Sequence, residues 1–152
     1  MRRFVLFLSL FTPTLPAFAL DTRQVAPERL LTLGSQLSSH AGSSQWQQLW
    51  QRTRAAGHFA AGPGRAYFTI DQAALPELAR QALGQAEHVQ ALDTTQVRYK
   101  RAIPGSPVGM LDGQPLHSLC VVIDWRSLPE AADGTAHASL RGASLMATYP
   151  CN

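Results

Sequence analysis

The spacing of apolar residues changes partway along this chain, and this change restricts the folds that it can adopt. Up to about residue 94, apolar residues recur three and four positions apart, which is typical of amphipathic helices. From there on they alternate with polar residues, which is typical of strands packed on one face. The order predicts an α+β class, with two or three N-terminal helices packed on one face of a small C-terminal antiparallel sheet.

Three segments of the first half have helical spacing. The first covers residues 27–37 and opens on a proline, a residue that the first turn of a helix accepts. The second begins at Ser44 and places Trp46 and Trp50 on one stripe, a spacing more often found in a core than in an exposed aromatic pair. The third covers residues 75–86 and has the most continuous apolar stripe.

The second half contains four segments with strand character. They cover residues 95–102, 108–111, 116–124 and 139–149. The Asp112-Gly113 pair between the second and third segments predicts a tight hairpin turn. The third segment carries apolar residues on both faces, so we expect it to be a central strand.

The first residues of the chain have the features of a secretory signal peptide. Arg2 and Arg3 precede an apolar run over residues 4–11, and residues 17–19 have the small-x-small pattern of a cleavage site. The run is shorter than the roughly 20 residues needed to cross a bilayer, so we expect no stable membrane span. We therefore expect residues 1–19 to be a signal peptide and residues 20–152 to be a single exported α+β domain, periplasmic or secreted, with a loose leader before the first helix.

The charge of the mature chain argues against some classes of partner. Two of the 13 basic residues belong to the signal peptide, which leaves 11 basic against 10 acidic groups. Proteins that bind nucleic acids or anionic membranes need an excess of basic groups to meet phosphates. We therefore expect no nucleic-acid partner.

The two cysteines predict a disulfide. Cys120 and Cys151 are the only cysteines, and an even number in an exported chain indicates pairing. The alternative is a reactive thiol beside His117, which the strand spacing disfavours because residues three apart point to opposite faces.

Motifs for catalysis or cofactor binding are missing from the sequence. The segment over residues 105–109 has Gly-x-Ser-x-Gly-like spacing but carries Pro107 at the centre, so it fits a rigid turn better than a nucleophile elbow. The five histidines show no metal-ligand spacing, and no glycine-rich phosphate loop is present, so we expect no metal and no cofactor. Asp124, His117 and His137 are the only weak candidates for a catalytic site assembled from distant residues.

These observations favour a non-catalytic module that binds another protein of the envelope or exterior, of the inhibitor, immunity or secretion and conjugation accessory type. The alternatives are a small cell-envelope hydrolase and a structural subunit of an envelope complex. The candidate contact surface is the strand with Arg98, Tyr99 and Arg101 together with the turn over residues 103–109, because charge, an aromatic ring and a rigid turn coincide there.

The strand pattern sets a condition on this surface. Arg98 and Lys100 share one face and Tyr99 points to the other, so a bulge or a strand end is needed to bring all of these side chains together. Arginine is preferred over lysine at interface cores, which favours Arg98 and Arg101 as anchors. Tyr99 adds contact area only if it faces outward.

Overall fold

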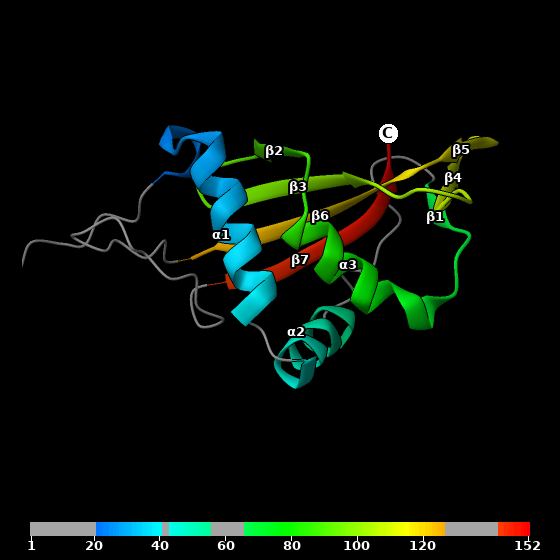
Figure 1. Cartoon of the computed structure of the whole chain (residues 1–152), viewed down its shortest axis with the longest axis horizontal. Helices are drawn as coiled ribbons and strands as arrows, with labels where there is room; N and C mark the ends of the chain where they lie inside the picture. The colour runs from blue at the N-terminus through cyan, green and yellow to red at the C-terminus, as the bar shows by residue number, and fades with distance from the viewer. Residues whose placement is uncertain (1–20, 41–42, 56–65, 127–142) are drawn as a thin grey trace, which may run out of the picture.

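A computed structural model describes residues 21–40, 43–55, 66–126 and 143–152, and its α+β architecture confirms the predicted fold class (Figure 1). The helices are α1 (Pro27–His40), α2 (Ser43–Ala55) and α3 (Leu75–Gly84). Short 3-10 turns cover Thr22–Gln24 and Gln72–Ala74. The strands are β1 (Tyr67–Phe68), β2 (His88–Ala91), β3 (Gln96–Ala102), β4 (Gly109–Leu111), β5 (Gln114–Leu116), β6 (Ser118–Trp125) and β7 (Ala143–Cys151).

The strands form two antiparallel sheets. The larger sheet has the order β2-β3-β6-β7, so β6 is a central strand, as the sequence predicts. Its β3–β6 register runs from Gln96 opposite Asp124 to Ala102 opposite Ser118 without interruption, which keeps alternate residues of β3 on one face. The smaller sheet has the order β1-β4-β5 and lies at one end of the larger one (Figure 1).

The core lies between the larger sheet and the helices, because α1 and α3 cross the same face of that sheet (Figure 1). Side chains at alternate positions of β3, β6 and β7 form the sheet side of this core. They are Val97, Tyr99, Leu119, Val121, Ile123, Trp125, Ala143 and Leu145. Leu30, Leu33 and Leu37 of α1 pack on these side chains beside Leu83 of α3.

The tryptophan stripe of α2 belongs to this core. Trp46 and Trp50 are 2% and 6% exposed. The indole Nε1 of Trp46 donates a hydrogen bond of 2.7 Å to the carbonyl oxygen of Pro76, which ties α2 to the first turn of α3. The core interpretation of this stripe is therefore confirmed, and the helix offers no exposed tryptophan pair for a ligand.

A glycine allows α1 to lie directly on the sheet. A Cβ at Gly34 would lie 2.6 Å from Cε1 of Tyr99 and 3.1 Å from the carbonyl oxygen of Leu83. Glycine lowers helix propensity by about 1 kcal/mol relative to alanine. Here it is tolerated because any larger residue would push α1 away from the tyrosine ring.

The sequence predicts a loose leader before the first helix, and this prediction is wrong from Asp21 onward. Thr22 is fully buried in a 3-10 turn. Its backbone N–H donates to the carbonyl oxygen of Thr94 at 2.9 Å, and its hydroxyl donates to that of Asp93 at 2.7 Å. These bonds join the start of the described chain to the turn between β2 and β3.

The predicted hairpin turn is confirmed, but its second strand differs from the prediction. Asp112 and Gly113 have φ values of 50° and 78°, the left-handed backbone that a two-residue hairpin turn requires. The turn joins β4 to a separate short strand, β5, of which only Leu116 falls within the predicted strand over residues 116–124. The edge strand β2 was not predicted at all.

None of the described helices is long and apolar enough to cross a membrane.

Candidate functional site

The face of the larger sheet that points away from the helices carries a group of basic and polar side chains. Strand pairing places His88 opposite Lys100, and Gln90 opposite Arg98. Arg98 and Lys100 alternate with the core residues Val97 and Tyr99, and His88 and Gln90 are their cross-strand partners. All four therefore lie on the other side of the sheet. No helix of the described ranges covers this side (Figure 1). We call the surface formed by His88, Gln90, Arg98 and Lys100 the basic face.

A hollow of about 500 Å³ lies over the basic face. The disulfide between Cys120 and Cys151 also lines this hollow, together with Asn152. Cys120 lies directly opposite Lys100, so the disulfide borders the cationic side chains on the same side of the sheet. Its Cα atoms are 6.0 Å apart, and it links β6 to the end of β7, which confirms the pairing that the cysteine count predicts.

The guanidinium of Arg98 is held in place by two neighbours. Nη1 donates to the hydroxyl of Tyr149 at 3.4 Å, and Nη2 donates to Oε1 of Gln90. A guanidinium has five N–H donors, so three remain for other partners. The geometry orients the charge without neutralising it.

Neither Arg98 nor Lys100 has an acidic partner within the described ranges. The ion pairs within 4 Å among those residues join Arg23 to Asp21 and Arg80 to Glu77, both at 2.7 Å. Both lie in the helical half of the chain. Arg98 and Lys100 are half-buried and line the hollow without an acidic partner among the described residues.

Tyr99 does not face outward, so the condition for its contribution to the predicted contact surface is not met. Its side chain is 0% exposed. The hydroxyl donates to the carbonyl oxygen of Leu30 at 2.9 Å and accepts from Nε1 of Trp125 at 3.1 Å. Burial raises the pKa of Tyr99 well above its ordinary value, and the bond from Trp125 offsets a smaller part of that rise. The residue is a core element that joins α1 to the sheet.

Arg101 lies on the side of the sheet that carries Tyr99. It is half-buried, and it pairs in register with Leu119, a core residue. Arg98 and Arg101 therefore point to opposite faces, and no bulge interrupts β3 between them. The predicted surface of Arg98, Tyr99 and Arg101 is divided by the structure, and Lys100 is the residue that accompanies Arg98. The binding role of either arginine stays a prediction.

Two of the weak catalytic candidates, His117 and Asp124, are not brought together. His117 precedes β6 and Asp124 lies near its other end, so their backbones are about 23 Å apart at roughly 3.3 Å per residue. His117 is exposed, and Oδ1 of Asp124 is buried without a hydrogen-bond partner. His137 lies outside the described residues. The described part of the chain contains no group of three or more histidine, cysteine or acidic residues that could hold a metal ion.

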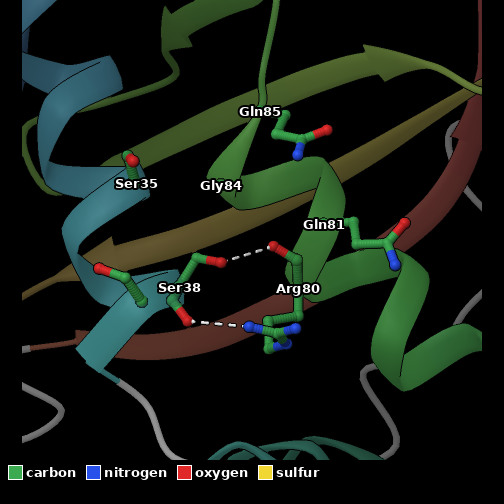
Figure 2. Close-up of a pocket in the computed structure, with 7 residues that line it drawn as sticks. Ser35, Ser38, Arg80, Gln81, Gly84 and Gln85 are labelled. Carbon is green, nitrogen blue, oxygen red and sulfur yellow. Dashed lines mark hydrogen bonds between the residues drawn. The ribbon is translucent and has the colours of Figure 1, made fainter.

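A second, smaller hollow of about 220 Å³ lies between α1 and α3 (Figure 2). Figure 2 shows Ser38 and Arg80 bonded to each other across it: the Ser38 hydroxyl donates to the Arg80 carbonyl oxygen at 2.9 Å, and Nη1 of Arg80 donates to the Ser38 carbonyl oxygen at 3.3 Å. The guanidinium also holds the carboxylate of Glu77, and this hydrogen bond lowers the pKa of Glu77. Because the charge is matched and the polar groups bond one another, this hollow is a seam of helix packing.

Sequence reasoning missed two parts of the basic face. His88 and Gln90 belong to β2, whose four residues are too few for an alternating pattern to distinguish a strand from a turn. A signal was present in the His-Val-Gln-Ala pattern before the Asp93 turn, where polar and apolar residues alternate over four positions.

Fold and site together define a disulfide-bonded α+β domain with helices on one face of its main sheet and a cationic hollow on the other. Comparisons with known proteins found no match to this chain among family models, curated proteins or solved structures.

Proposed function

We propose that this protein is a non-catalytic binding module that acts on another protein outside the cytoplasm, in the periplasm or as a secreted protein. Inhibitors, immunity proteins and accessory subunits of secretion or conjugation machinery work in this way. The observation that carries the proposal is the pair of Arg98 and Lys100 on a sheet face that no described helix covers. Charged side chains that have no acidic partner among the described residues, held over a hollow by a rigid sheet, suit recognition of a second molecule.

The disulfide supports the compartment. Disulfides persist in oxidising environments and are rare in the cytosol. The bond between Cys120 and Cys151 ties the last strand to the centre of the sheet, beside the hollow. The sequence pattern of residues 1–19 agrees with export, although those residues lie outside the described part.

Crosslinking in intact cells tests the proposal. We expect gentle crosslinking followed by purification of the tagged protein to yield a discrete partner that is absent from cells carrying an unrelated exported protein with the same tag. A monomeric protein without a partner, with turnover on a panel of peptidoglycan fragments and peptides, would contradict the proposal and support an envelope hydrolase. A stoichiometric complex of several subunits that survives gel filtration would support a structural subunit.

A further inference from the structure

We propose that the partner presents an acidic polypeptide segment, and that this segment docks on the basic face with its carboxylates bound by Arg98, Lys100 and His88. This inference rests on the proposed function and identifies the surface and the chemistry of the partner. It differs from the surface expected from the sequence, because it replaces Tyr99 and Arg101 with residues of β2 and β3 that the fold brings together.

The basic side chains lie close together on one face of the sheet. Lys100 lies two residues after Arg98, which places their Cα atoms about 7 Å apart on one face of the strand. His88 lies directly opposite Lys100, at a Cβ separation of about 5 Å. The charges of Arg98 and Lys100 repel each other at their spacing along the strand, and no described carboxylate lies within 4 Å of either side chain. An acidic ligand therefore removes a repulsion as well as adding attractions.

Two hydrogen bonds fix the guanidinium of Arg98 in an orientation suited to a carboxylate. Gln90 and Tyr149 each accept one of its N–H groups, so the guanidinium is already positioned before a ligand arrives. The remaining N–H donors match the two oxygens of a carboxylate, with which arginine forms paired hydrogen bonds. A side chain that is fixed in advance loses little conformational entropy on binding.

The size of the site and the charge of the chain select the occupant. A volume of about 500 Å³ accommodates several side chains of a partner, which exceeds the needs of a single small anion. The predicted mature chain has nearly balanced charge, with 11 basic and 10 acidic residues, whereas nucleic acids and anionic membranes favour an extended basic excess. A short acidic segment of a protein fits a local cluster on an otherwise balanced surface.

Peptide titration tests the inference. The probes are an acetylated and amidated peptide of alternating glutamate and glycine, and a matched peptide with glutamine in place of glutamate, titrated into isotopically labelled protein at low salt. We expect the glutamate peptide to shift the amide signals of β2 and β3 around His88 and Lys100, and the glutamine peptide to shift none. The double variant Arg98→Gln/Lys100→Gln should bind the glutamate peptide at least about tenfold more weakly. The matched control Arg101→Gln, on the same strand but the opposite face, should bind within about twofold of the unmodified protein.

Several results would overturn the inference. Equal binding of the two peptides would show that charge does not direct the contact, and equal binding by the double variant would show that the site lies elsewhere. Stronger binding to vesicles of phosphatidylglycerol or to single-stranded DNA than to the glutamate peptide would replace the protein segment with another polyanion. A thermal midpoint measured for each variant separates loss of binding from loss of folding.

Capture in cells separates this inference from the function on which it rests. Loss of the crosslinked partner in the Arg98→Gln/Lys100→Gln variant supports both. Undiminished capture by that variant overturns the basic face as the docking site and leaves the binding function intact. Failure of the unmodified protein to capture any partner contradicts the proposed function itself.

Discussion

Replacing Tyr99 with phenylalanine removes one oxygen atom from the centre of the core and breaks two hydrogen bonds. The lost bonds are the donation to Leu30 and the acceptance from Nε1 of Trp125. The ring itself stays in place, so no cavity of significant size forms. A net hydrogen bond contributes about 1 kcal/mol, and an indole N–H left buried without a partner costs about 1–3 kcal/mol. We expect Tyr99→Phe to lower the free energy of unfolding by about 2–3 kcal/mol, measured by urea denaturation at pH 7.

The same variant should change the pH dependence of stability. Burial raises the pKa of Tyr99 in the folded protein, whereas an unfolded tyrosine ionises near pH 10. Above about pH 10 the unfolded state therefore binds fewer protons, and the free energy of unfolding falls as pH rises, by up to about 1.4 kcal/mol per pH unit. Below pH 10 the stabilisation that Tyr99 provides is fully present, and above pH 10 the unmodified protein loses part of it. Phenylalanine does not ionise, so Tyr99→Phe does not show this fall in the free energy of unfolding. We expect the stability gap between the two proteins to narrow by roughly 1 kcal/mol between pH 8 and pH 11.

A double-mutant cycle with Trp125→Phe identifies the source of the effect. If Tyr99 and Trp125 act through their mutual hydrogen bond, the loss in the double variant is smaller than the sum of the single losses by about 1 kcal/mol. A cost of Tyr99→Phe below about 0.5 kcal/mol, or a stability gap that stays constant from pH 8 to pH 11, would refute this account of the core.

Three further substitutions test the packing. Gly34→Ala should destabilise the protein by about 1–3 kcal/mol despite the better helix propensity of alanine, because the new Cβ would lie 2.6 Å from the ring of Tyr99; a raised urea midpoint would contradict this. Cys151→Ser should cost about 3–4 kcal/mol, since the disulfide spans 31 positions of the chain; the check is an unfolding midpoint that falls equally when the unmodified protein is reduced. Thr148→Val should leave the free energy of unfolding unchanged or raise it by up to about 1 kcal/mol, because the hydroxyl of Thr148 is buried without a hydrogen-bond partner. A fall in this free energy of more than about 1 kcal/mol, measured by calorimetry, would show that the hydroxyl is bonded.

The helices and the central strand could be predicted because their apolar residues repeat over many positions. The stripe of α3 and the two-sided apolar pattern of β6 persist for 10 and 8 residues. The strands β2 and β5 have only 4 and 3 residues, which is too short for periodicity to distinguish a strand from a turn. Their existence depends on pairing with β3 and β4, which a pattern along one segment does not contain.

The sequence predicts which residues of β3 share a face, but it does not predict which residues of other strands and helices lie beside them. The strand period correctly separated Arg98 and Lys100 from Tyr99. Which of the two faces the helices cover is decided by packing on Leu119 and Val121, far along the chain. The support of Arg98 by Tyr149 joins residues that are 51 positions apart, so it follows from tertiary structure alone.

The two hydrogen bonds that join Thr22 to the Asp93 and Thr94 carbonyl groups form a clasp, and if residues 1–19 are a signal peptide, this clasp constrains the order of maturation. The clasp begins three residues after Ala19, the predicted cleavage point. A signal peptidase must bind its site in an accessible, extended segment, and a buried 3-10 turn so near the site competes with that requirement. For a chain with this cleavage point, cleavage should therefore precede closure of the clasp, and docking of the segment around Thr22 should be a late step of maturation.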